Sequence, residues 1–487
     1  MSLAQNDAEP RWISVLFLFL VIGAGIALGV FIPVANGFLK AIVITVGAIG
    51  AILTLFRVDI GLYILILMAY LRVSDIAIDY HGLPSVFQPF IALLIAAILI
   101  KWIRSREIQK GWGRAAILVL AYGLVVFTSL LYAVDYTTAS NAVSDFAKNG
   151  VITILLVILI QQRSIFRGAL WVIVIAGIFT GSISVFQYLT KTFTNPYWGF
   201  GQAAILNIVT GTDDYRISGP IGDPNFYAQI LVVIVPLAFH FMMSEKKLIL
   251  RALAAWSLVV CSLSIIFTYS RGGAIALGVV LVCLIVYRKL RPLEILLIAL
   301  LVVGIYAYLP NQYIARLDTI TQIASGQTNV IQDVSLRGRL SELLVAWQMF
   351  VEHPIIGVGV GNYPALYQSY SRQIGLDPRT ENREPHNLFL EVAAETGMIG
   401  LGVFLLVLYF SFRAIRQAWL VFRRAGLKDY AGLVAVFGIG LVGYLTAALF
   451  IHGAYPRYFW LLIGLALALP QVAKDIPSEP KQELSGE

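Results

Sequence analysis

The chain has 487 residues, of which 59% are hydrophobic and only 13% are charged. Soluble domains have about 45–50% apolar and about 25% charged residues, so this composition excludes an ordinary water-soluble protein. The net charge of +8 is spread over short loops rather than over one continuous face, which does not favour a nucleic-acid-binding protein.

Long apolar runs recur from Trp12 almost to Pro470, and a helix needs roughly 20 such residues to cross a bilayer. The runs are continuous and lack the alternation of barrel strands, so we expect an all-α polytopic membrane protein with about 12–14 transmembrane helices. Residues 1–11 are polar and predict a cytoplasmic N-terminus rather than a cleaved signal sequence. The predicted spans are residues 12–32, 38–56, 59–71, 86–103, 115–133, 147–161, 168–189, 225–243, 249–268, 272–287, 292–309, 386–412, 430–451 and 456–470.

Basic residues in alternate loops predict the orientation of these spans. Short loops rich in lysine and arginine stay on the cytoplasmic side, which places both termini inside. The basic segments are Lys101–Arg114, Arg163–Arg167, Lys246–Arg251, Arg288–Arg291 and Arg413–Lys428. The predicted organisation begins with an N-terminal transmembrane bundle over 12–189 and a central region over 190–309, which has an outer loop at 190–224. A large partly helical periplasmic loop follows over 310–385. The chain then has C-terminal helices over 386–470 and a cytoplasmic tail over 471–487.

The large outer loop contains one clear helical pattern, over Leu336–Val351. Apolar residues spaced by four, three and four positions share one face of this helix. They are Leu340, Leu344, Trp347 and Val351. Such a helix either lies flat on the membrane or covers a cavity between spans, and its period does not distinguish the two. The GVGVGN sequence at 357–362 lacks G-x-G-x-x-G spacing and a preceding strand, so it predicts a tight turn rather than a nucleotide-binding loop.

The same loop holds six arginines and no lysine, whereas the cytoplasmic loops mix the two types. Guanidinium groups bind phosphate oxygens with paired hydrogen bonds and keep their charge at physiological pH, so the set predicts an anionic ligand. Seven carboxylates in this loop make a simple ion pair the alternative for any single arginine. The arginines are Arg316, Arg337, Arg339, Arg372, Arg379 and Arg383.

Two further arginines lie where outer loops meet spans. Arg271 belongs to the SRGG sequence at 270–273, between the ninth and tenth spans, where topology gives no reason for a cation. A charge at a lipid-facing edge is unfavourable unless it snorkels, pairs or lines a cavity, so we expect a ligand role for Arg271. Arg216 precedes the eighth span, in which Asp223 is the predicted N-cap and Pro224 the first helical residue. A structural role is therefore the alternative for Asp223.

His386 opens the twelfth span on the outer side, after Pro385. Proline fits the start of a helix, and the positive end of the helix dipole disfavours a protonated ring, so His386 is expected to be a neutral proton acceptor at pH 7. Asn387, Glu391 and Glu395 are spaced by four and share a face that runs into the membrane. Carboxylates there indicate a polar network or a reaction site, and for Glu395 a bond to a neighbouring helix is the alternative.

Three sequences resemble the membrane domain shared by O-antigen ligases, O-antigen polymerases and related exopolysaccharide polymerases. They are SRGG at 270–273, RGRLSELLVAWQMFVEHPIIGVGVGNY at 337–363 and HNLFLEVAAETGMIGL at 386–401. The resemblance implies a GT-C-like glycosyltransferase of the bacterial inner membrane. Such an enzyme moves a glycan from undecaprenyl diphosphate to a sugar hydroxyl on the periplasmic face. The acceptor is a lipid A–core sugar of lipopolysaccharide in ligases and another glycan in polymerases.

The resemblance also implies roles for single residues. His386 matches a histidine proposed as general base for the acceptor hydroxyl. Arg271 and Arg216 match arginines thought to hold the diphosphate, and Arg339 matches one in the periplasmic loop with a less settled role. The residues expected to support them are Ser270, Asp223, Asn387 and Glu395. The family is thought to work without a metal or other cofactor, which agrees with a sequence whose outer loops have no Asp-x-Asp.

A small-anion transporter of bicarbonate type is the alternative from another functional class, because intramembrane glutamates would suit one. No inverted repeat and no paired broken helices support it, and the arginines gather on one side of the membrane. Polymerase is slightly favoured over ligase, since nothing in the sequence indicates lipid A recognition.

Overall fold

The computed structural model describes residues 38–105, 111–205, 215–288, 334–375, 381–453 and 457–475. Within these ranges the chain is helical apart from loops and one two-stranded hairpin. The chain forms two compact units, one of residues 1–65 with 85–108 and a larger one of residues 66–84 with 109–487. The smaller unit contains α2 (Phe38–Phe56) and α5 (Phe87–Ser105), and every candidate site residue belongs to the larger unit.

Nine helices in the described ranges are long and apolar enough to cross a membrane. A further pair, α3 (Val58–Leu71) and α4 (Val73–His81), is bent by 51° and raises the number to ten if it forms one span. These helices confirm an all-α polytopic membrane protein, while the predicted spans 12–32 and 292–309 lie outside the described residues. The nine are α5, α6 (Gly113–Thr128), α7 (Tyr136–Leu159), α8 (Arg163–Thr190), α9 (Pro224–Ser244), α10 (Leu248–Phe267), α11 (Arg271–Arg288), α16 (Leu388–Arg424) and α17 (Lys428–Ala447).

The shorter apolar helix α18 (Arg457–Val472) corresponds to the last predicted span. Four consecutive residues from Trp460 to Ile463 are fully buried, so every side of the helix meets other helices. The hydroxyl of Thr153 in α7 donates to the carbonyl of Trp460 at 2.9 Å. Because α18 is enclosed by protein, its length does not have to match the thickness of a bilayer.

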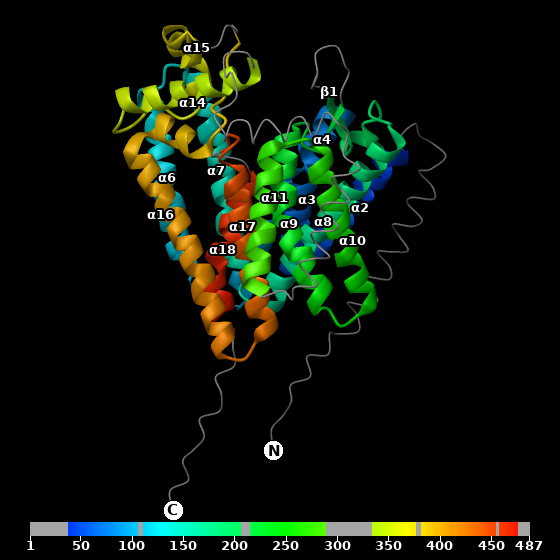
Figure 1. Cartoon of the computed structure of the whole chain (residues 1–487). Coiled ribbons are helices and arrows are strands. Elements are labelled where there is room, and N and C mark those ends of the chain that lie inside the picture. The colour runs from blue at the N-terminus through cyan, green and yellow to red at the C-terminus, as the bar shows by residue number, and fades with distance from the viewer. Residues whose placement is uncertain are drawn as a thin grey trace, which may run out of the picture. The chain divides into compact units, whose positions relative to one another are not determined.

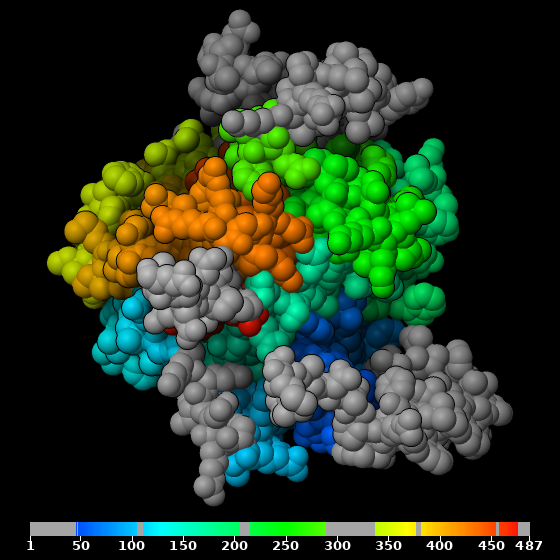
Figure 2. Space-filling model, turned by 90° about the horizontal axis from the view of Figure 1, so that it is seen from below, coloured from blue at the N-terminus to red at the C-terminus, as the bar shows by residue number. Residues whose placement is uncertain are grey.

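At one end of the larger unit, charged side chains connect three spans. Arg167 of α8 donates to Glu245, directly after α9, at 2.6 Å and to Asp429 of α17 at 2.5 Å. The ring of His240 in α9 lies 3.1 Å from the same Asp429. Figure 2 views this end and shows the turn between α16 and α17 (orange) beside the turn between α9 and α10 (green).

The opposite end, called here the cap end, carries the remaining elements. Figure 1 shows α14 (Val334–Glu352) and α15 (Tyr363–Ile374) lying across the ends of the spans there. The helix predicted at 336–351 is therefore confirmed as α14. The cap end also holds an antiparallel hairpin of β1 (Gln202–Ile205) and β2 (Tyr215–Gly219), which the apolar pattern did not predict because both strands are short.

The sixth predicted span, at 147–161, was wrong in its starting residue. It is α7, which begins at Tyr136 because Asp135 caps it: the Asp135 carboxylate accepts a hydrogen bond from the Thr138 amide at 3.1 Å. The first three turns of α7 are polar, and an apolar-run criterion therefore missed them.

The twelfth predicted span, at 386–412, was wrong in both limits. It is α16, which runs from Leu388 to Arg424 and breaks at Gly397, where φ is +63° and ψ is −164°. The residues after the break are enough to cross a bilayer, since roughly 20 are needed. The residues before the break form a separate short helix at the cap end.

At this break some backbone amides and carbonyls lose their partners within the helix. A loop after α14 forms hydrogen bonds with them. The two amides after Gly397 donate to the carbonyls of Pro354 and Ile355 at 2.7 and 3.2 Å. Before the break, the carbonyls of Ala394 and Glu395 accept from the amides of Val358 and Gly359, at 2.9 Å each. The GVGVGN sequence is thus a turn that brings backbone against backbone, as predicted, and its amides are engaged by the protein itself.

Replacing Gly397 with alanine is expected to destabilise the protein by about 3 kcal/mol or more. The new Cβ would lie 2.4 Å from the carbonyl carbon of Ile355, and φ is in the left-handed region. Gly402→Ala in the same helix is the control, because its Cβ meets nothing within 4 Å and alanine favours a helix. Unfolding in increasing SDS measures both variants, and equal midpoints would contradict the docking.

Candidate active site

The candidate site centres on His386, which lies between α15 and α16 at the cap end. Its Nδ1 is 2.7 Å from Oε2 of Glu342 and 3.1 Å from the carbonyl oxygen of Glu384. The Glu342 side chain, which comes from α14, is 1% exposed, whereas that of His386 is 28% exposed. The carbonyl oxygen of Glu384 only accepts hydrogen bonds, so Nδ1 is the donor, and in the neutral ring Nε2 has the lone pair. The ring is held by one nitrogen and is able to take a proton on the other.

Glu342 also binds a guanidinium group. Its second oxygen accepts from Nε of Arg383 at 2.8 Å, and its backbone carbonyl accepts from the hydroxyl of Tyr363 at 2.7 Å. These partners compensate the buried carboxylate for its lost hydration. Arg383 therefore forms an ion pair, but with a buried carboxylate rather than with the solvent-exposed one expected as the alternative, and this carboxylate also orients His386.

The start of α16 differs from the prediction. Asn387 is the N-cap, and its side-chain oxygen accepts from the amides of Phe389 and Leu390 at 3.0 Å each. Pro385 is therefore outside the helix, and His386 precedes the cap instead of lying in the first turn. The contact that fixes the ring is Glu342, not the end of the helix dipole.

Two buried glutamates of α16 also differ from their predicted environment. Both precede the break, so they belong to the short helix at the cap end. Glu391 accepts from the amide of Gly453 at 2.9 Å, and Glu395 accepts from the amide of Tyr363, the first residue of α15, at 3.3 Å. They bond to loops and to the neighbouring helix rather than lining a face within the membrane, which favours the structural alternative for Glu395.

Helix capping and close packing explain three of the four residues of the SRGG sequence. The hydroxyl of Ser270 accepts from the amide of Gly273 at 3.2 Å and so caps α11. A Cβ on Gly272 would lie 2.8 Å from that of Phe450, and one on Gly273 would lie 2.6 Å from that of Ala228. These glycines let α11 approach its neighbours closely. The capping and packing do not explain why Arg271, the first residue of α11, is an arginine.

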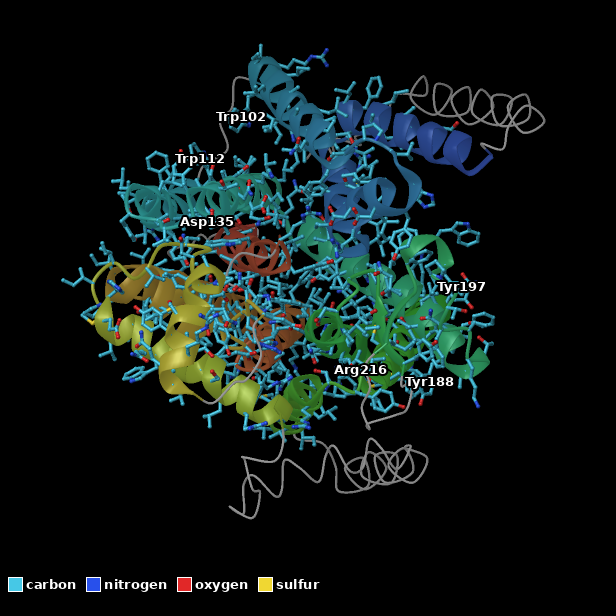
Figure 3. All side chains as sticks on the ribbon, turned by 90° about the horizontal axis from the view of Figure 1, so that it is seen from above. Trp102, Trp112, Asp135, Tyr188, Tyr197 and Arg216 are labelled. Atoms are coloured by element: carbon cyan, nitrogen blue, oxygen red, sulfur yellow. The ribbon has the colours of Figure 1, made fainter. Side chains whose placement is uncertain are left out.

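Arg216 lies on β2 and is 5% exposed. Its Nε donates to the carbonyl of Thr268 at 2.7 Å, and its Nη2 donates to the side chain of Asn225 at 3.1 Å. Figure 3 places Arg216 at the cap end, among the green elements and on the opposite side of the unit from Trp112. Arg216 thus connects β2, the start of α9 and the segment before Ser270, and it adds a buried positive charge there.

Asp223 caps α9, as predicted. Its carboxylate accepts from the amides of Asn225 and Phe226 at 2.7 and 3.0 Å, with Pro224 in the first turn. Capping is sufficient to explain an acidic residue at this position, so no contact with a substrate is needed to explain it.

Arg339 of α14 meets the SRGG segment at a small hollow. The hollow has a volume of about 10 Å³, which is room for no more than one water molecule. Its lining includes Arg339, Ser270, Asn225 and Ile451. The loop that supplies Ile451 also binds the start of α16, because the carbonyl of Ala448 accepts from the amide of Leu388 at 2.9 Å. The structure therefore brings together the SRGG motif, Arg339 and the segment that carries His386.

A second histidine, His452, lies against His386, with ring centroids 5.9 Å apart and rings nearly perpendicular. Burial, with a further contribution from His386, lowers the pKa of His452 to about 4. Its Nδ1 is buried and has no hydrogen-bond partner. The place of His452 near the end of a predicted span gives no signal in the sequence for this contact.

His452 is expected to make stability depend on pH. Its pKa is about 4 in the folded chain and about 6.5 in an unfolded one, so the unfolded state binds more protons between these values. Stability is therefore lost as pH falls, by about 2 kcal/mol between pH 7 and pH 5. The melting temperature of His452→Gln should fall less over this interval than that of the parent, and identical decreases would contradict the assignment.

A larger cavity, of about 430 Å³, lies at the same end behind the turn that precedes α9. Arg72 forms part of its wall, donating to Asp75 at 2.8 Å and to the carbonyl of Ile221 at 3.0 Å. The volume falls in the range of small-molecule sites. The lining residues are Arg72, Asp75, Ile76, Asp79, Tyr80, Gln202, Pro220 and Ile221.

Within the described residues no group of three or more histidine, cysteine and acidic side chains is placed to hold a metal ion. The predicted arginines Arg316 and Arg379 lie outside the described residues. Arg372 is exposed on α15 and is not among the residues that line the hollow.

The family model of the O-antigen ligase matches residues 256–405. Over these residues, less than a third of the chain, the protein is similar to the O-antigen ligase family, and we call them the O-antigen ligase domain. The O-antigen ligase domain begins in α10, ends in α16 and contains Arg271, Glu342 and His386, whereas Arg216 precedes it. No curated protein matches the chain. This match supports glycan transfer of the O-antigen ligase type in general.

Replacing Glu342 with glutamine is expected to lower the turnover of the O-antigen ligase domain by about tenfold or more, because an amide orients the ring less strictly than a carboxylate does. The loss should appear in kcat rather than in KM, since Glu342 is buried behind the ring. Glu352→Gln on the same helix is the control, as that carboxylate is exposed and, among the described residues, accepts from Tyr370 and Gln348. Unchanged kcat in Glu342→Gln would exclude an orienting role.

Proposed function

We propose that this chain moves a glycan from an undecaprenyl diphosphate-linked donor to a sugar hydroxyl at the periplasmic face of a bacterial inner membrane. The observation that carries the proposal is the hydrogen bond between His386 and the buried Glu342, inside the O-antigen ligase domain. A sugar hydroxyl is a weak nucleophile and needs a base, which a histidine held by Nδ1 supplies. The same base serves a polymerase, whose acceptor is another glycan, and a ligase, whose acceptor is lipid A–core.

In the proposed reaction, Nε2 of His386 takes the proton of the acceptor hydroxyl while the hydroxyl oxygen bonds to the anomeric carbon of the donor glycan. The bond between that carbon and the diphosphate oxygen breaks, and its electrons leave with undecaprenyl diphosphate. Arg271, Arg216 and Arg339 provide positive charge where negative charge develops on the leaving group. The proton on His386 then passes to solvent or to the released diphosphate.

The distribution of basic residues supports a periplasmic cap end. The opposite end holds the residues that the positive-inside rule places in the cytoplasm. They include Arg163, Arg167, Lys246, Lys247, Arg251, Arg288, Arg423, Arg424 and Lys428. A diphosphate at the membrane surface, with its polyprenyl chain in lipid, would then meet Arg271 at the periplasmic start of α11.

The polar cavity behind the α9 turn suits a sugar. Carboxylates, a guanidinium and an amide bind hydroxyl groups, and Tyr80 provides an aromatic face. We assign this cavity to the glycan of the donor or of the acceptor, next to the diphosphate site.

The proposal is tested by transfer in vitro. Purified protein in nanodiscs is given an undecaprenyl diphosphate-linked glycan, with and without lipid A–core, in EDTA. A ladder of longer lipid-linked glycans identifies a polymerase, and product on lipid A–core alone identifies a ligase. A native donor that is bound but not consumed under either condition would overturn the proposal.

A further inference from the structure

The helix α14 is apolar on two faces: Val345, Ala346 and Met349 are buried in a hydrophobic cluster, and a second set of apolar residues lies on the outer face. Its predicted apolar face is exposed: Leu344 is 40%, Trp347 is 54% and Val351 is 55% exposed. The polar residues Ser341 and Glu342 are 0% and 1% exposed and face the protein. A helix at the edge of a protein in water has polar and charged side chains on its outer face, where α14 has Leu344, Trp347 and Val351.

The neighbouring helix α15 provides the comparison within the same molecule. Its buried residues are Tyr363, Tyr367 and Ser371, and its exposed residues include Ser369, Arg372 and Gln373. This is the pattern of a helix whose outer face meets water. Two adjacent helices at one end of the chain therefore present surfaces to different solvents.

The apolar face of α14 continues into surfaces of the spans. Directly after α14, Ile355 and Ile356 are 63% and 47% exposed. The loop that carries them binds α16 where its long part begins, and there Met398 and Ile399 are 61% and 50% exposed. Exposed apolar residues on a membrane-spanning helix face lipid. The outer face of α14 and this lipid-facing surface thus form one apolar surface.

We infer that α14 lies on the lipid surface at the cap end, with the Leu344, Trp347 and Val351 face inserted among the acyl chains. Figure 1 shows α14 transverse to the spans, and Figure 3 shows it along the edge of the larger unit, which is the geometry of an interfacial helix. A tryptophan on the inserted face is typical of the membrane interface. Of the two alternatives that the sequence left open for this helix, the structure favours lipid contact.

This placement links the membrane to the site. The inserted helix also carries Glu342, which holds His386, so the depth of α14 in lipid sets the position of that carboxylate. The lipid contact itself does not depend on the proposed function. Failure of the transfer assay and failure of this inference are therefore distinguishable.

The test uses the full chain with Cys261 and Cys283 replaced by alanine and one new cysteine, labelled with the fluorophore NBD. The position is Leu344 or Val351 on α14, with Ser369 on α15 as the control. The protein is reconstituted in vesicles of phosphatidylethanolamine and phosphatidylglycerol. We expect short-wavelength emission, quenching by lipids spin-labelled on the acyl chain and protection from iodide at both α14 positions. The control should show the reverse.

Quenching by iodide at positions 344 and 351 would show that the face meets water and would overturn the inference. Protection from both quenchers would show that protein covers it, either a second copy or residues 289–333, and would overturn it equally. As a second variant, Leu344→Glu should shift the emission of a label at 351 to longer wavelength, whereas Gln373→Glu on α15 should leave it unchanged.

Discussion

Replacing His386 with alanine is expected to lower the turnover of glycan transfer by about 10²–10⁴-fold, the usual contribution of a general base. The ring is the group that Glu342 holds at 2.7 Å, and alanine removes the proton acceptor while leaving the N-cap of α16 at Asn387 in place. Folding should therefore be little affected. Donor consumption and product formation are measured under saturating donor.

His353→Ala is the matched control for this variant. That histidine is exposed directly after α14, and its backbone donates to the carbonyl of Met349 and accepts from the amide of Gly357. Its removal should leave turnover within about twofold of the parent, as for surface substitutions in general. Near-normal turnover in His386→Ala would remove the base assignment, even if the chain proved to be a transferase.

Replacing Arg271 with lysine is expected to leave less than about a tenth of the activity although the charge is kept, because an ammonium group cannot reproduce the paired hydrogen bonds of guanidinium to phosphate. Arg271→Ala should lose more, about 10²–10³-fold, as when one donor to a developing oxyanion is removed. The capping by Ser270 and the close packing of the two glycines remain intact in both variants. Donor consumption is followed at several donor concentrations to separate kcat from KM.

Arg372→Lys on α15 is the control for this substitution, since Arg372 is exposed and far along the chain from the SRGG segment. Equal activity in Arg271→Lys and in the parent would show that a point charge is sufficient. The proposal of a bidentate contact to diphosphate would then be abandoned, while the role of His386 would be unaffected.

Local signals explain which parts of the fold were predictable. The N-cap at Asp223, the helix over 336–351 and most spans follow from residue types that act over three or four positions. The break at Gly397 was missed because a glycine in an apolar run is ordinary in a membrane helix. Its strained conformation arises from contact with a loop some forty residues earlier in the chain.

The site was predictable only in part, for the same reason. His386 was identified by its position near a span and by resemblance, but its partner Glu342 is 44 residues away and comes from another helix. In the sequence, Glu342 is one of seven carboxylates in a loop rich in arginine, and no spacing distinguishes it. The outward apolar face of α14 was visible as a periodicity, but the direction in which it faces depends on packing.

The junction between the loop after α14 and the break in α16 is made almost entirely by amides and carbonyls, with Gly357 and Gly397 as the points of nearest approach. Because these hydrogen bonds are made by the backbone, the number of residues from Pro354 to Gly359 fixes how the loop pairs with α16. Inserting or deleting one residue there would move α14 along α16 and carry Glu342 away from the ring that it holds. For this joint, the number of residues is more important than their identity.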